Sequence, residues 1–394
     1  MHINRHFDFA SLLPLKERWN ELSDGVPFRS WEWVEAWWRH YACHNDGRPK
    51  RDHELFVLTV WDENNRLVAI APWYRQVSRS GARVIRFLGD GEVCSDYLSL
   101  LCDRGEEQAV AAALADWLTI QNQSSAIAVS RWDRMEFIGV SDDDLPVRLL
   151  LAQLQEEGST VHRTPGLNTW RITLPGTWEE FLMVLSKPHR NRLRRADKNY
   201  FQSGLVQIRR AQTEDDVATW FDILVDLHQR NWQRRGMPGC FASEQFLALH
   251  GELSRRFFHD GRATLTWLEM EGKPLAVEYR LHGTDIMYAY QCGIDPERLK
   301  VQPGELANMA SIRNAIERGQ LAYDFLRGDE PYKAHWRAAP QPMFTIRVIP
   351  RRASSRLRHQ AWLAGQNVKQ WIKSGLELTR LRKSASSAHP QQSP

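Results

Sequence analysis

The chain has 394 residues, enough for about two domains of ordinary size. Apolar residues make up 42% of it and charged residues 25%, and this composition excludes a disordered or fibrous protein. The formal net charge is +4, but residues 351–394 hold nine Lys or Arg and one Glu, so this tail carries +8 and residues 1–350 carry −4. The body therefore lacks the composition of a general nucleic-acid-binding protein.

The five cysteines show no CxxC spacing, and their odd number argues against a disulfide framework or a zinc site. They fit a reducing compartment. The N-terminus lacks the apolar core of a signal peptide, and no stretch of about 18 uncharged apolar residues occurs. We therefore expect a cytoplasmic protein without a metal requirement.

The first half is predicted to mix helices and strands. Ser30 is placed to cap an aromatic-rich helix over 31–41, whose tryptophans we expect in the core. Polar turn residues at 62–65 separate two predicted strands, 55–61 and 67–73. Further strands are expected over 84–88, 97–101 and 134–140, and a helix over 106–118.

The second half repeats this order. Thr213 and Asp216 resemble a capping box that opens a helix to about Gln233, and a second amphipathic helix is expected over 243–258. The remaining expected elements are strands over 263–269, 275–281, 286–291, 321–326 and 343–349, with a helix over 304–318.

An internal repeat relates the two halves. Residues 58–70 align without a gap on residues 265–277, and residues 134–138 resemble residues 322–326. The match fits either two generic β-hairpins or a duplicated α+β unit.

Two segments of the second half are candidates for chemistry. The loop 299–308 leads into a helix with Pro303 and Gly304 at its start, where backbone N–H groups can hold a pyrophosphate, although Glu305 would oppose an anion. The segment 324–336 crowds ionisable side chains at a strand-to-helix turn, which suits a cleft or, alternatively, a solvated turn.

Three segments resemble the CelD/BcsL family, namely 28–33, 186–195 and above all 323–333, which reads YDFLRGDEPYK. These are GNAT-type acetyltransferases linked by name to cellulose and exopolysaccharide biosynthesis. The resemblance covers roughly residues 5–350. It implies an α+β fold of two tandem GNAT-like domains, each a mixed, mainly antiparallel sheet with flanking helices, related to the Fem-type aminoacyl-tRNA-dependent transferases.

The resemblance and the repeat together predict three regions. Residues 1–165 form an N-terminal GNAT-like domain without a donor site, because residues 102–107 are acidic where a phosphate would bind. Residues 166–350 form a C-terminal GNAT domain with the donor and catalytic sites. Residues 351–394 form a basic helical tail with a disordered end.

The resemblance also implies an acyl-CoA site at the helix start. GNAT enzymes hold the pyrophosphate with a Gln/Arg-x-x-Gly-x-Gly/Ala loop; here Gln302 and Ala307 fit the ends, while Glu305 replaces the middle glycine. The expected donor contacts are Gln302, Pro303, Gly304, Glu305, Leu306 and Ala307.

The expected catalytic residues are Glu278 as general base, Tyr332 as proton donor to the departing thiolate, and Asp324. A Glu278–Arg280 surface pair and a packed Tyr332 are the structural alternatives. Acceptor or phosphate binding is expected from a set of charged residues, for which an ion network or a solvated helix face is the alternative: Arg327, Asp329, Lys333, Arg190 and Arg194.

We therefore expect an acyltransferase that moves an acetyl or other acyl group from acyl-CoA to an amine or hydroxyl of a saccharide or its precursor. The alternatives are a Fem-like transferase that uses aminoacyl-tRNA, and an inactive GNAT scaffold in a polysaccharide synthesis complex. The basic tail is expected to dock on the acidic body or to contact anionic lipid or membrane-bound synthesis machinery.

Overall fold

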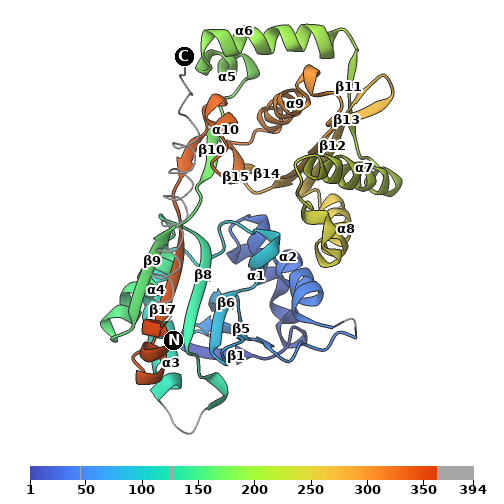
Figure 1. The fold of residues 1–394 in the computed structure, drawn as a ribbon. Helices are drawn as coiled ribbons and strands as arrows, with labels where there is room; N and C mark the ends of the chain where they lie inside the picture. The colour runs from blue at the N-terminus through green and yellow to red at the C-terminus, as the bar shows by residue number, and fades with distance from the viewer. Residues whose placement is uncertain (45, 124–127, 362–394) are drawn as a thin grey trace, which may run out of the picture.

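The structure is a computed structural model that describes residues 1–44, 46–123 and 128–361. Its two halves each consist of a mixed, mainly antiparallel β-sheet with flanking helices (Figure 1). This confirms the predicted α+β, tandem GNAT-like fold class.

The N-terminal half contains β1 (His2–His6), β2 (His53–Leu55), β3 (Val57–Trp61), β4 (Leu67–Ala71), β5 (Trp73–Val77), β6 (Arg83–Phe87), β7 (Leu101–Cys102), β8 (Arg134–Ser141) and β9 (Thr160–Pro165). Its helices are α1 (Lys16–Leu22), α2 (Trp31–Trp37), α3 (Glu107–Gln123) and α4 (Leu145–Glu156).

The C-terminal half contains β10 (Thr169–Thr173), β11 (Val206–Arg210), β12 (Ala263–Met270), β13 (Lys273–His282), β14 (Ile286–Ile294), β15 (Ala322–Arg327), β16 (Ala339–Gln341) and β17 (Met343–Ile349). Its helices are α5 (Trp178–Val184), α6 (Lys187–Ala196), α7 (Glu214–Gln233), α8 (Glu244–His259), α9 (Pro303–Glu317) and α10 (Pro331–His335). Short 3-10 and π-helical turns connect some of these elements.

The two sheets follow the same plan. In the C-terminal half the strand order is β11-β12-β13-β14-β15-β10-β16, and β14 and β15 are its parallel pair. In the N-terminal half, β2 and β3 are two parts of one bent strand, as are β4 and β5, and Phe56 N donates to Trp73 O across the bend at 3.1 Å. The strands there have the orders β1-β3-β4-β7 and β2-β5-β6-β8-β17-β9, which the two bent strands join, and β6 and β8 are parallel.

This plan confirms the internal repeat. The hairpins β3–β4 and β12–β13 hold the same places in their sheets, and so do β8 and β15.

The N-terminal sheet includes one strand of the C-terminal half. Strand β17, near the C-terminal end of the described residues, lies between β8 and β9 of the N-terminal sheet. Strand β10, directly after β9 in the chain, lies between β15 and β16 of the C-terminal sheet. Figure 1 shows these strands running along one side of the molecule and joining its two parts. The predicted boundaries 1–165 and 166–350 stay a prediction; the strands of the C-terminal sheet all lie within 169–341, whereas β17 joins the N-terminal sheet from beyond residue 166.

The halves also share one hydrophobic core. Helix α2 packs against α8, and the Trp33 ring stacks on Phe257 and meets Tyr290 edge-on, with centroids 6.2 and 5.3 Å apart. Ion pairs Arg256–Glu35 and Arg262–Glu32, each 3.0 Å, flank this contact. The aromatic cluster of α2 is therefore core, as expected from the sequence.

The structure confirms the helix starts that the sequence predicted from capping residues. Ser30 accepts from Trp33 N, Ser243 accepts from Phe246 N, and Thr213 forms the full capping box with Asp216. The expected strand over 97–101 is wrong, because Tyr97 has a positive φ of 63° that interrupts extended backbone, and only β7 is a strand there.

The basic tail begins with residues docked on the N-terminal half. A helix over 353–361 buries Ser355 and His359, and Arg352 and Arg358 lie 3.4 and 3.5 Å from Asp133. Residues 362–394, which hold most of the predicted tail, lie outside the described residues. In the described part of the chain, no helix combines the length and apolarity needed to cross a bilayer.

The position of β17 makes a stability prediction. Ile346 of β17 is 2% exposed and packs in the core of the N-terminal half. Ile346→Ala should lower the free energy of unfolding by about 2–5 kcal/mol within a single transition, because β17 couples both halves. Chemical denaturation followed by circular dichroism measures this, with the half-buried neighbour Thr345→Ala as the control of smaller effect. Two independent transitions would contradict the coupling.

Candidate active site

A cavity of about 760 Å³ opens where β14 and β15 separate. The two strands pair in parallel only between residues 286–288 and 322–324, and they diverge after that point. The start of α9, the helices α6, α7 and α10, and the loop 237–240 line the remaining walls. We call this the β14–β15 cavity.

A β-bulge in β14 faces this cavity. Tyr279 and Arg280 are consecutive on β13 but pair with Gln291 and Ala289, so Tyr290 is the extra residue. The buried Arg280 guanidinium donates to the Gln291 carbonyl at 3.1 Å, and the Tyr290 hydroxyl donates to Val93 O at 2.8 Å. Bulges of this kind often re-aim backbone groups beside active sites.

The start of α9 brings three of the six expected donor residues to the cavity. Gly304, Glu305 and Ala307 line it. The other three do not: Gln302 is exposed with a φ of 54°, and Pro303 and Leu306 are buried in the core. The amides of Glu305 and Leu306 already donate to the Gln302 carbonyl, at 3.0 and 3.2 Å.

The acidic residue at this helix start is paired. Arg192 of α6 lies 2.6 Å from the Glu305 carboxylate, and both residues line the cavity. Burial raises the pKa of Glu305, while Arg192 opposes this shift. The repulsion of an anion that the sequence predicted is therefore offset by a neighbouring cation.

The cation at the cavity is not one of the two expected from α6. Arg190 and Arg194 do not line it, and Arg194 instead pairs with the exposed Glu179 at 2.8 Å. The residues of α6 that line the cavity are instead His189 and Arg192.

Glu278 lines the cavity but is committed to a buried network. Its side chain is 4% exposed, and its two carboxylate oxygens contact Arg280 and the Ser311 hydroxyl of α9. Burial raises the pKa of Glu278, and Arg280 opposes this shift. Glu278 and Arg280 thus form an ion pair, as the structural alternative expected, but the pair is buried and not on the surface. The role of Glu278 as general base stays a prediction.

Tyr332 of α10 also lines the cavity. Its side chain is 44% exposed, and its ring meets Phe325 edge-on with centroids 5.7 Å apart. Partial burial raises the pKa of Tyr332, so the hydroxyl is protonated at neutral pH. Its role as a proton donor stays a prediction.

Asp324 lies on the opposite side of β15. Its buried carboxylate accepts from the Tyr97 hydroxyl at 2.6 Å and from Arg171 Nε at 2.9 Å. This corrects the expectation that Asp324 lies in one site with Glu278 and Tyr332. Neighbouring residues of a strand face opposite sides of its sheet, and on β15 it is Phe325, not Asp324, that lines the cavity. Asp324 instead links the two halves.

Two further charged residues near the end of β15 are also held by ion pairs or hydrogen bonds within the protein. Arg327 lines the cavity but pairs with the buried Asp96 of the N-terminal half at 2.6 Å. Asp329 does not line it and accepts from Asn168 and Trp170, at 2.9 and 3.0 Å. The predicted acceptor-binding role of Asp329 is corrected accordingly.

Lys333 holds the strand-to-helix turn together. Its side chain is 2% exposed, and its ammonium donates to the carbonyls of Leu326, Arg327 and Gly328 at 3.1, 3.2 and 2.9 Å. Leu326 has a φ of 58° and Gly328 one of 126°, so these donations stabilise a backbone that bends sharply. Lys333 lines the cavity, and its predicted acceptor-binding role stays a prediction.

Several cavity residues were not expected from the sequence. His189 and His335 line it, and so do His228 and Cys240. His189 is 92% buried, and its Nδ1 atom donates to the His335 carbonyl at 3.0 Å. No local motif marks His228 and Cys240, because one sits on α7 and the other in a loop that the fold brings beside it.

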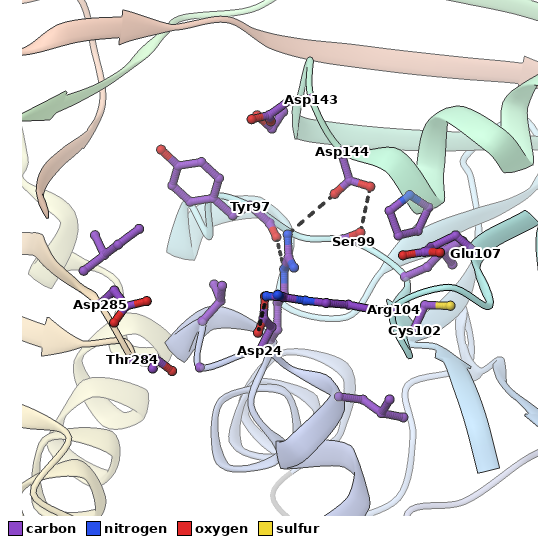
Figure 2. A pocket seen from close by; sticks show the side chains of 18 of the residues that line it. Asp24, Tyr97, Ser99, Cys102, Arg104, Glu107, Asp143, Asp144, Thr284 and Asp285 are labelled. Atoms are coloured by element: carbon purple, nitrogen blue, oxygen red, sulfur yellow. Dashed lines mark hydrogen bonds and ion pairs between the residues drawn. The ribbon is translucent and has the colours of Figure 1, made fainter. Parts of the chain in front are cut away.

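A second cavity, of about 690 Å³, lies at the starts of α3 and α4, and residues of the C-terminal half such as Arg171 and Tyr288 also line it. Helix α4 follows β8, and α3 follows the short strand β7. Figure 2 shows Asp143 and Asp144 at one wall, Asp24 paired with Arg104 at another, and Thr284 and Asp285 of the C-terminal half facing them. We call this the α3–α4 cavity.

The α3–α4 cavity is acidic. Seven carboxylates line it against three arginines: Glu21, Asp24, Asp103, Glu107, Asp143, Asp144 and Asp285 against Arg29, Arg104 and Arg171. The β14–β15 cavity has the opposite balance, with Arg192, Arg235, Arg280, Arg327 and Lys333 against Glu278, Glu305 and Glu330. This contrast supports the prediction that the N-terminal half holds no donor with phosphate groups. Among the described residues, no group of three or more His, Cys, Asp or Glu is arranged to hold a metal ion.

The C-terminal half thus has a sheet that splits between its parallel strands, a bulge beside the split and a helix that starts there. Residues 187–334 match the family described as "Acetyltransferase (GNAT) domain". The expected enzyme class, a GNAT-type acyltransferase, is confirmed by this match. No curated protein sequence matches the chain.

Two solved structures are similar to nearly the whole described fold. FemX matches with a TM-score of 0.60 and 11% identity, over 88% of this chain and 97% of that one. A conserved protein of unknown function from Bacteroides thetaiotaomicron VPI-5482 matches with a TM-score of 0.53 and 10% identity, over 88% of this chain and 100% of that one. At these identities the likeness shows the fold.

The buried network predicts the main effect of removing Glu278. Glu278→Gln leaves the buried Arg280 without its anion and should lower the free energy of unfolding by about 3–5 kcal/mol. The double variant Glu278→Met/Arg280→Met removes both charges and is expected to recover most of this loss in a denaturant titration. If Glu278→Gln keeps its stability and turnover falls about 10²–10⁴-fold, Glu278 is the general base.

The Lys333 contacts predict a structural defect. Lys333→Met removes the donor to three backbone carbonyls, so the free energy of unfolding should fall by about 1–3 kcal/mol or more. Lys300→Met, which removes one exposed positive charge near the start of α9, is the matched control and should leave stability unchanged. Wild-type stability with a raised KM for the acceptor would instead restore the substrate-binding role of Lys333.

Proposed function

We propose that the C-terminal half transfers an acetyl or other acyl group from acyl-CoA to an amine or hydroxyl of an acceptor. The observation that carries this proposal is the β14–β15 cavity, which joins the start of α9 to the bulge of β14 in one space. A long donor with phosphates at one end and a thioester at the other fits such a space.

The charges of the cavity support a phosphate-bearing donor. Its lining holds five cationic side chains against three carboxylates, and Arg192 lies beside the first turn of α9. The partial positive charge of a helix start adds to the attraction of Arg192 for an anion. Gly304 leaves space at the wall of the cavity formed by the start of α9, since a Cβ at position 304 would meet only Ile294, at 4.0 Å.

The chemistry needs a proton donor for the leaving thiolate and an acceptor nucleophile freed of its proton. Tyr332 is protonated and lines the cavity, so it is the proposed donor of that proton. Glu278 serves as base for direct attack only if its carboxylate leaves Arg280 and Ser311, to which both its oxygens are bonded.

The acceptor that we propose is a saccharide or its precursor, in exopolysaccharide or cellulose biosynthesis. The support for it is the resemblance of the segment 323–333 to the CelD/BcsL family. We place the protein in the cytoplasm, with a peripheral contact to the membrane or to synthesis machinery through the basic tail beyond residue 361.

The second candidate is a Fem-like transferase that uses aminoacyl-tRNA. The fold likeness to FemX favours it, and so does the row of exposed basic residues on α6 next to the cavity. An inactive GNAT scaffold is the third. Thermal-shift measurements with acetyl-CoA, longer acyl-CoAs and charged tRNA separate the three, since a ligand at 100 times its Kd stabilises a protein by about 2.7 kcal/mol.

The placement of the donor predicts the effect of filling the start of α9. Gly304→Trp should abolish acyl-CoA binding in calorimetry without loss of melting temperature, because the indole extends into the cavity. Gly304→Ala is the matched control: its Cβ has room, so it should bind acyl-CoA with nearly wild-type affinity. Unchanged affinity in Gly304→Trp would remove the donor from this cavity.

A further inference from the structure

The α3–α4 cavity is bounded by both halves of the molecule. Residues at the starts of α3 and α4, among them Glu107 and Asp143, form the wall of the N-terminal half. The turn after β13 brings Thr284 and Asp285 of the C-terminal half to another wall, and Tyr288 of β14 lines the cavity as well (Figure 2). A molecule held in this cavity would therefore contact both halves.

The positive charges of the lining are neutralised within the protein. Each of the three arginines that line the cavity lies beside a carboxylate: Arg29 is 3.5 Å from Asp144, Arg104 is 3.3 Å from Asp24, and Arg171 is 2.9 Å from the buried Asp324. Two more of the acids are paired from outside the lining, because Arg18 lies 2.8 Å from Glu21 and 2.5 Å from Asp103.

Three carboxylates of the lining have no cation at ion-pair distance in the described part of the chain, namely Glu107, Asp143 and Asp285. Glu107 accepts from Gly105 N at 2.8 Å and Asp143 accepts from the Ser141 hydroxyl, and neither donor is charged. Figure 2 shows the three carboxylates on different sides of the cavity. The lining thus presents separated negative charges to a ligand.

A buried hydroxyl belongs to the same lining. Tyr288 is 2% exposed, and its hydroxyl has no hydrogen-bond partner among the described residues. Burial and Asp324 raise the pKa of Tyr288, whereas Arg171 and Arg29 lower it, so the hydroxyl lies among the charged groups of the cavity. Because buried polar groups nearly always have a partner, this hydroxyl indicates a molecule in the cavity that bonds to it.

The arrangement of the carboxylates favours an extended organic cation over a metal ion. Among the described residues, no group of three or more His, Cys, Asp or Glu is placed to hold one ion. A flexible chain with several ammonium groups can bring one of them to each carboxylate, and an ammonium N–H can also donate to a hydroxyl oxygen. The volume of about 690 Å³ is that of a small-molecule site.

We propose that the α3–α4 cavity binds a linear polyamine. Its ammonium groups pair with Glu107, Asp143 and Asp285, and one of them donates to the Tyr288 hydroxyl. The inference goes beyond the proposed acyl transfer and requires neither the acyl-CoA donor nor the β14–β15 cavity. Since Asp285 and Tyr288 belong to one half and Glu107 and Asp143 to the other, the bound polyamine stabilises the contact between the halves.

The test is calorimetry of the full chain with spermidine, at low ionic strength and without acyl-CoA. One spermidine should bind per chain and raise the melting temperature, and added salt should weaken the binding. Putrescine, which lacks one of the ammonium groups of spermidine, should bind more weakly. Mg²⁺ should not displace spermidine at equal concentration, and displacement by Mg²⁺ would overturn the assignment of an organic cation.

A pair of exposed carboxylates provides the first variant. Asp143→Asn/Asp285→Asn should weaken spermidine binding about 10-fold or more, because two ion pairs with the ligand are lost. Asp222→Asn/Glu317→Gln is the matched control: it removes two exposed carboxylates that do not line the cavity, and it should keep nearly wild-type affinity. An equal loss in both double variants would overturn the proposal, since it would show only general attraction to an acidic protein.

The second variant tests the hydroxyl. Tyr288→Phe keeps the ring and should weaken spermidine binding about 10-fold, the scale of a hydrogen bond to a charged group. Circular dichroism checks that this buried position still folds, and if it does not, the exposed Asn pair decides. Unchanged affinity in a folded Tyr288→Phe chain would overturn the placement of the ligand at this hydroxyl.

The outcomes separate this inference from the proposed function. Failure of the wild-type chain to bind either polyamine overturns the polyamine site and leaves acyl transfer untouched, because acyl-CoA binding is measured by itself. Conversely, the Asp143→Asn/Asp285→Asn variant should bind acyl-CoA as the wild type does, since neither residue lines the β14–β15 cavity.

Discussion

The insertion of β17 into the N-terminal sheet is the constraint on which the rest of the structure depends. This strand of the C-terminal half lies between β8 and the edge strand β9, so the N-terminal half has no complete sheet of its own. Polar contacts reinforce the join: Asp324 accepts from Tyr97, and Asp96 pairs with Arg327. The turn after β15, which bounds the β14–β15 cavity, is thus anchored from the N-terminal half.

Charge in the cavity is largely balanced within the protein. The carboxylates that line it are held by neighbouring cations, which keeps buried charge compensated. The lining of the β14–β15 cavity holds five cationic side chains against three carboxylates, whereas the α3–α4 cavity has an acidic lining.

The sequence predicted what is local and missed what is not. Capping residues such as Thr213 and the repeated hairpins follow from short-range hydrogen bonding and pattern, and the structure confirms them. The insertion of β17 into the N-terminal sheet joins segments far apart in the chain, and no local pattern marks it. Asp324 was expected among the catalytic residues of a cleft, but alternation along β15 turns Phe325 and not Asp324 toward the cavity. His228 and Cys240 carry no local motif, and only the fold brings them together at one wall of the cavity.

The insertion of β17 into the N-terminal sheet has a consequence for synthesis of the chain on the ribosome. Arg347 of β17 pairs with Glu136 of β8 across 211 residues of sequence, so the N-terminal sheet waits for nearly the whole described chain before its gap is filled. Until then β8 and β9 present unpaired edges, which are templates for wrong pairing. Contacts of such long range also slow folding. We therefore expect a growing chain of this protein to bind a chaperone until β17 has been synthesised.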